Sequence, residues 1–176
     1  MGAAAEEHTV RYAADVTVKD VWAVDEFLSQ RLDTATRAHA PDTEEHRTAS
    51  ALAESVARLV LELEWSITGA MPGRVRPPTD APTPAPLTAE QIREQAKARL
   101  RRTFDDWNHL CAIAGHWQTD PAYNGARWHE VEFLDAEAEH IYDQQVASLR
   151  AQGILRPLPP ADSHGGSGPE DRRGAR

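Results

Sequence analysis

The sequence predicts an all-α fold: a bundle-like domain of four helices, arranged as two helical hairpins joined by a proline-rich linker. In four long segments, apolar residues recur at spacings of three and four, which is the period of one helix face. Between the second and third segments, residues 71–87 contain six prolines, which neither helix interiors nor sheet ladders accept. The four helices therefore fall into two pairs.

The first helix is expected at 18–39, after an extended N-terminal arm at 1–17. Pro41 ends this helix, because a proline disfavours helical geometry in the residue before it. Its apolar stripe consists of five residues at helical spacing: Val21, Val24, Leu28, Leu32 and Ala35.

The second helix is expected at about 43–70, with Asp42 or Thr43 as its cap. It is apolar on two sides, since Leu61 and Trp65 lie opposite its main apolar stripe. A helix of this kind is either central in its domain or part of an interface.

The third helix is expected at about 88–118. Thr88 and Gln91 form a capping-box pattern, in which each side chain bonds to the backbone N–H of the other residue. The fourth helix is expected at about 128–152, with Gly153 at the position of a C-terminal cap. A short connection should make these two helices antiparallel neighbours, so that acidic residues of the fourth neutralise the basic first half of the third.

Residues 18–155 are expected to form a single domain that contains the linker, followed by a disordered tail at 156–176. The chain has 176 residues and a formal net charge of −9, so neither nucleic acid nor a membrane is the expected partner. Its one cysteine fits a reducing compartment, and it lacks a signal-like or membrane-spanning run. The expected location is the cytoplasm.

Metal binding is the sharpest route to catalysis in this sequence. Asp106 with His109, and Glu137 with His140, space a carboxylate and an imidazole by three residues, as carboxylate-bridged di-metal bundles do. Helical phase opposes this interpretation, since it turns His109 away from the core, where the ligands of a bundle metal must point. We therefore expect no metal and no cofactor, and the sequence contains no nucleophile motif or phosphate-binding loop.

Side chains suited to recognition gather in residues 104–134, which hold three of the five tryptophans and the single cysteine. An Asp-Pro pair followed by Asn-Gly favours turns, so 118–127 should be a compact loop with Tyr123 packed between Trp117 and Trp128. Tryptophan is common at interface hot spots and also as a lid on small helical cores. Both interpretations stay open at this point.

Two segments resemble a known family. They are Phe27-Leu28-x-x-Arg31-Leu32-Asp33, and Leu110-x-x-Ile113-Ala114-x-x-Trp117-x-x-Asp120-Pro121-x-Tyr123 with Trp128 after it. These are similar to the two ends of a family of small uncharacterised proteins of high-GC actinobacteria, which have an FL-x-x-RLD helix and an aromatic-x-x-His-Pro-Asp-Tyr turn before a Trp. Here Asp120 and Ala122 stand where that family has His and Asp. The resemblance implies an ordered turn but no activity.

We expect a non-catalytic cytoplasmic adaptor or regulatory module that acts through protein–protein interaction, with self-association as the simplest form. Two alternatives remain open. One is a helical bundle that binds a metal or a small ligand, with or without enzymatic activity. The other is an acidic inhibitor of a nucleic-acid-binding protein, which the net charge of −9 alone suggests. The predicted interaction residues are Leu61, Trp65, Trp117, Tyr123 and Trp128.

Overall fold

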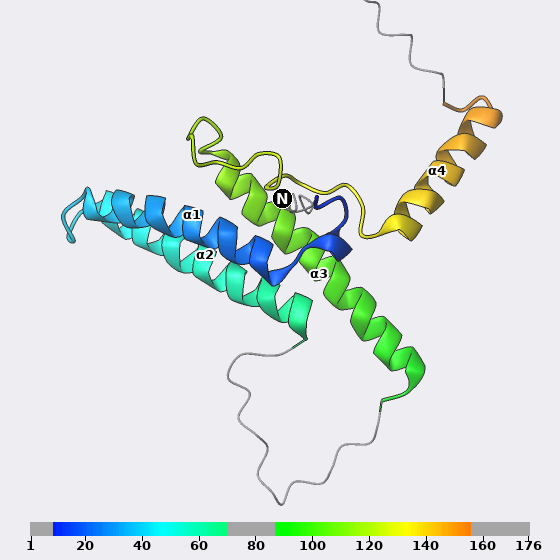
Figure 1. Cartoon of the computed structure of the whole chain (residues 1–176), viewed down its shortest axis with the longest axis horizontal. Coiled ribbons are helices and arrows are strands. Elements are labelled where there is room, and N and C mark those ends of the chain that lie inside the picture. The colour runs from blue at the N-terminus through cyan, green and yellow to red at the C-terminus, as the bar shows by residue number, and fades with distance from the viewer. Residues whose placement is uncertain (1–8, 70–86, 156–176) are drawn as a thin grey trace, which may run out of the picture. The chain divides into compact units, whose positions relative to one another are not determined.

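The computed structural model describes residues 9–69 and 87–155, and it confirms the all-α prediction (Figure 1). Residues 1–8 of the predicted arm, 71–86 of the predicted linker and the predicted tail at 156–176 lie outside the described residues. The elements in the described ranges are one 3-10 helix and four α-helices: η1 Ala13–Asp15, α1 Val18–Arg37, α2 Glu44–Thr68, α3 Ala89–Gly115 and α4 Ala136–Ala151.

Each of the first three helices begins directly after a threonine that caps it. The hydroxyls of Thr17, Thr43 and Thr88 each accept a hydrogen bond from the backbone N–H three residues further on, which satisfies a donor that the helix itself cannot. At Thr88 the predicted capping box is confirmed, because the Gln91 side chain also accepts from the Thr88 N–H at 2.9 Å. Gly153 adopts the left-handed conformation predicted for it, with φ 71°.

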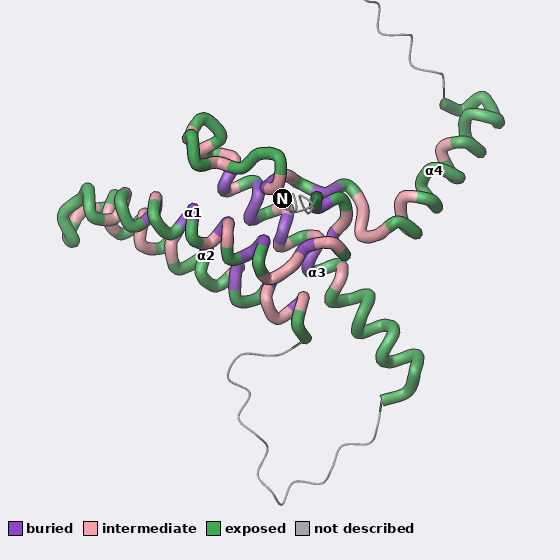
Figure 2. The backbone as a smooth tube through the Cα atoms, viewed as in Figure 1, coloured by how far each residue is buried: buried purple, intermediate pink, exposed green. Residues whose placement is uncertain are grey.

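The core forms where α1, α2 and α3 meet. α1 and α2 lie antiparallel as a hairpin, and α3 crosses them (Figure 1). Figure 2 shows that buried residues line the facing sides of the three helices, whereas the first half of α3 is exposed. Leu28, Leu63 and Trp107 supply one large, fully buried side chain from each helix. Each such burial stabilises the fold by about 2 kcal/mol.

The segment 9–17, expected as an extended arm, contains η1 and contributes to this core. Val10 and Ala13 are buried. The backbone N–H groups of Ala13 and Ala14 donate to the carbonyls of Phe133 and Leu134 at 3.1 and 3.0 Å. The arm therefore has a backbone partner far along the chain, which no local sequence pattern indicates.

The fourth helix begins later than the sequence predicts, at Ala136 instead of near 128. Residues before it are held in other ways: Asn108 donates to the Val131 carbonyl at 2.9 Å and accepts from the Val131 N–H at 2.8 Å. Asp135 then caps the helix, since its Oδ1 accepts from the Ala138 N–H at 2.8 Å. The chain divides into two compact units, 1–139 and 140–176, and none of the residues of α4 is buried.

Candidate interaction surface

Three aromatic rings pack together where the loop after α3 meets α1, and we call them the aromatic corner: Phe27, Tyr123 and Trp128. The Trp128 ring centroid lies 4.9 Å from that of Phe27 and 5.7 Å from that of Tyr123. The Tyr123 hydroxyl donates to the Trp128 carbonyl at 2.9 Å, and Trp128 is only 7% exposed. Trp117 is half-buried and packs against the same core. The aromatic corner is thus largely turned inward, which suits a structural role better than recognition.

An ion pair fixes this loop to α1. The Arg31 guanidinium lies 2.7 Å from the Asp120 carboxylate, and its central carbon lies 3.7 Å from the Phe27 ring centroid. Hydrogen bonds from the Ala122 backbone and from Arg31 hold the pKa of Asp120 below its usual range. The segment around Phe27 and Arg31 therefore contacts the loop at Asp120 directly in the fold.

Exposed apolar side chains of the α1–α2 hairpin lie elsewhere, and we give the name α2 patch to two of them together with a half-buried tryptophan: Trp22, Leu61 and Trp65. Trp22 is 57% exposed and Leu61 is 50% exposed, while Trp65 is half-buried. Leu61 and Trp65 are one turn apart on α2 and so share a face. The Trp22 indole N–H donates to Glu64, which lies about 60° from Leu61 on the side away from Trp65, so Trp22 flanks Leu61 on that side.

Trp65 connects the α2 patch to α3. The guanidinium carbon of Arg102 lies 4.9 Å from the Trp65 ring centroid, within the range of a cation–π interaction. This contact fixes the orientation of the Trp65 ring without covering Leu61. Arg102 therefore covers part of Trp65, whereas Leu61 and Trp22 stay exposed.

The five predicted interaction residues fall into two groups, which the structure does not bring together. Leu61 and Trp65 lie on α2, whereas Trp117, Tyr123 and Trp128 follow α3. Trp65 contacts α3 at Arg102, which lies thirteen residues before the end of that helix. This separation is about 20 Å along the helix axis. Trp22 was not among the predicted residues; its position off the main stripe of its helix was the available signal.

The predicted metal alternative is not assembled in the described residues. Within 9–69 and 87–155, no three His, Cys, Asp or Glu side chains lie close enough to hold one ion. His109 is exposed, and Asp106 lies half-buried. Burial and the nearby charge of Glu62 raise the pKa of Asp106, and its Oδ2 has no hydrogen-bond partner in the described part of the chain. Burial also raises the pKa of the Cys111 thiol, which disfavours its nucleophilic thiolate form.

No protein-family model matches the chain, and neither a curated protein nor a solved structure does. The resemblance to actinobacterial proteins therefore stays a prediction. Over the described ranges, none of the helices has both the length and the apolar character that crossing a membrane requires.

Proposed function

We propose that this protein is a helical protein–protein interaction module, and that it acts by pairing with a second copy of itself through the outer face of α2. The observation that carries this proposal is the α2 patch: Leu61 is 50% exposed on α2, half-buried Trp65 lies one turn away, and Trp22 of the neighbouring α1 is 57% exposed. Tryptophans in ordered apolar patches are common interface hot spots. Exposed Leu61 contributes nothing to the core, so an interface role explains its presence best.

The outer face of α2 is complementary to itself, which favours a second copy as the occupant. Arg58 and Trp65 lie on the same side of Leu61, about 60° and 40° from it around the helix. If two copies of α2 pair antiparallel about a twofold axis at Leu61, Arg58 of one copy faces Trp65 of the other, and this contact occurs twice. A guanidinium against an indole ring is attractive.

The other side of Leu61 is compatible with the same pairing. There Glu64 of one copy faces Ala57 of the other, and the small alanine leaves room for the carboxylate. Further out, Glu54 faces Thr68, so like charges are not opposed along the seam. The pairing thus combines an apolar centre with two cation–π contacts, as isologous interfaces allow.

Disulfide trapping tests the geometry, because the native Cys111 is buried and an introduced surface thiol would react by itself. Leu61→Cys should form a covalent dimer under mild oxidation, read on a non-reducing gel. Thr68→Cys alone should not, since two Thr68 positions lie about 20 Å apart in the antiparallel pair and a disulfide needs Cα atoms within about 7 Å. A mixture of Glu54→Cys and Thr68→Cys should cross-link. Cross-linking by Thr68→Cys alone would overturn the antiparallel arrangement.

Sedimentation equilibrium tests self-association itself. Wild-type protein should dimerise in a concentration-dependent manner, and Leu61→Glu and Trp65→Ala should each weaken the dimer at least tenfold. Leu52→Glu is the matched control, because Leu52 is exposed on α2 but lies nine residues away, about 180° around the helix. A wild-type protein that remains monomeric at high concentration, or a control that weakens the dimer as much as Leu61→Glu, would contradict the proposal.

A further inference from the structure

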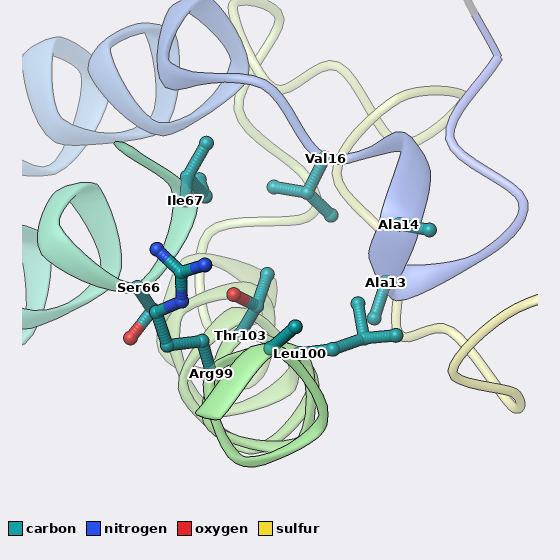
Figure 3. A pocket seen from close by; sticks show the side chains of 9 residues that line it. Ala13, Ala14, Val16, Ser66, Ile67, Arg99, Leu100 and Thr103 are labelled. Carbon is teal, nitrogen blue, oxygen red and sulfur yellow. The ribbon is translucent and has the colours of Figure 1, made fainter. Parts of the chain in front are cut away.

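A small hollow lies between η1, the end of α2 and the middle of α3 (Figure 3). Its volume is about 210 Å³. Val16, Ile67 and Leu100 give it apolar walls, and each comes from a different part of the chain. It is separate from the α2 patch and from the aromatic corner, so neither of these explains it.

Arg99 places a positive charge at this hollow. In Figure 3 its guanidinium points toward Ile67 at the end of α2. Its Nη1 lies so close to Gly69 that a Cβ there would come within 2.1 Å of it. Among the described residues, no carboxylate forms an ion pair with Arg99, although the chain has an excess of acidic residues. The guanidinium is therefore available to an anion in the hollow.

Thr103 adds a hydroxyl to the wall of the hollow. Buried threonines and serines in helices usually donate to the carbonyl four residues earlier. Thr34, Thr68 and Ser66 do this here, at 2.8, 2.8 and 2.9 Å. Thr103 is only 3% exposed as a residue and lines the hollow. Its hydroxyl oxygen is not one of the fully buried side-chain atoms without a partner in the described part of the chain, which fits a hydroxyl that is open to the hollow. A hydroxyl in such a place can donate a hydrogen bond to a molecule bound there.

We propose that this hollow binds a small monocarboxylate with a short apolar tail. The carboxylate pairs with Arg99 and accepts a hydrogen bond from Thr103, and the tail lies against Val16, Ile67 and Leu100. Ser66 supplies no donor, because its hydroxyl already donates to the backbone carbonyl of Glu62. One cation and one hydroxyl suit a single carboxylate better than a phosphate, which needs more donors.

The volume limits the length of the tail. The hollow is smaller than the ~300–1,000 Å³ of sites that hold drug-sized ligands. The ligand is therefore a carboxylate of a few carbon atoms.

Isothermal titration with sodium pentanoate tests the proposal, with pentanamide as the neutral analogue of the same shape. Pentanoate should bind at least tenfold more tightly than pentanamide. Arg99→Gln should weaken pentanoate binding at least tenfold, since it removes the charge from an exposed side chain without loss of core packing. Arg101→Gln is the matched control: Arg101 is exposed on α3 but does not line the hollow, so binding should be unchanged. Equal binding of pentanoate and pentanamide, or equal binding by wild type and Arg99→Gln, would overturn the proposal.

Thr103→Val supplies a second readout with a nearly isosteric side chain. It should weaken pentanoate binding several-fold, because it removes the hydroxyl donor and keeps the shape of the side chain. Unchanged pentanoate binding by Thr103→Val would overturn the role given to this hydroxyl. Leu61→Glu should leave pentanoate binding intact, so this site and the proposed dimer are tested separately.

Discussion

Arg127, in the loop after α3, forms an ion pair with Asp20 in the first turn of α1: its Nε and Nη2 atoms both lie 2.5 Å from Asp20 Oδ1. Asp20 is fully buried and also accepts hydrogen bonds from the N–H and the hydroxyl of Thr17, at 2.8 and 2.5 Å. Burial opposes ionisation of this carboxylate, but the hydrogen bonds from Thr17 and Arg127 outweigh it, so the pKa of Asp20 lies below its usual value. One side chain thus joins the cap of α1 to the loop that follows α3.

Asp20→Asn should destabilise the protein by about 2 kcal/mol at pH 7, because it weakens the charged hydrogen bonds of a fully buried side chain to Thr17 and to Arg127, whose own side chain is 35% exposed. Urea denaturation measures this loss. Asp33→Asn is the matched control: Asp33 pairs with Arg37 on the exposed surface of the same helix, and such pairs contribute less than about 1 kcal/mol. Equal losses in the two variants would show that the buried pair has no special role.

The Asp20 contribution should also depend on pH. Its pKa is lower in the folded state than the ~3.9 of an unfolded aspartate, so the folded state is stabilised above about pH 4. That stabilisation is lost as the pH falls through the folded-state pKa. The difference in unfolding free energy between wild type and Asp20→Asn should therefore shrink between pH 5 and pH 2. A difference that stays constant over this range would contradict the assignment.

Asp106→Asn should stabilise the protein at neutral pH. The folded-state pKa of Asp106 is raised, so ionisation above that pKa costs stability, whereas near pH 3 the group is neutral in both states. The gain in melting temperature should thus be present at pH 7 and disappear toward pH 3. Asp105→Asn, at the exposed neighbouring position, should show no such gain.

Gly69→Ala should destabilise the protein by about 1 kcal/mol, because Gly69 ends α2 in the left-handed conformation, with φ 70°. The added Cβ would also displace Arg99. Gly115→Ala offers the opposite case: it lies within α3, nothing lies within 4 Å of an added Cβ, and a gain of about 0.5 kcal/mol is expected. Chemical denaturation of both variants compares the two effects, and a loss at Gly115 would contradict this prediction.

Tyr123→Phe tests whether the aromatic corner is structural. The change removes the hydrogen bond to the Trp128 carbonyl and keeps the ring, so it should cost about 1 kcal/mol of stability. The dimer dissociation constant should stay unchanged, because Tyr123 lies away from the α2 patch. If Tyr123→Phe weakened the dimer and left the stability unchanged, the aromatic corner would be part of the interaction surface.

Helix positions were predictable because their signals are local. The starts of α2 and α3 follow from a threonine, with acidic residues or a glutamine in the first turn. Each of these capping signals lies within a few residues of the helix whose start it marks. The start of α4 was misplaced, because the apolar period continues upstream of it through Val131. That residue is held instead by Asn108, which lies on another helix.

The candidate site was only partly predictable for the same reason. The helical period correctly predicted that Leu61 points away from the core, since the direction of a side chain around its own helix depends on that helix alone. The inward packing of Trp128 depends on Phe27, and the hollow depends on three separate segments. Contacts between residues so far apart in the chain leave no periodic trace, so the pocket at Arg99 and Thr103 was not predicted.

The pairing of the N-terminal segment with Phe133 and Leu134 has a consequence for synthesis. Val10 and the apolar face of α1 are synthesised well before Phe133 and Leu134, with which the N-terminal segment pairs. The α1–α2 hairpin can form early from local contacts, whereas the complete core must wait until the chain has been made past residue 134. During that interval the nascent protein exposes part of its core, and truncation before this point should yield an aggregation-prone product.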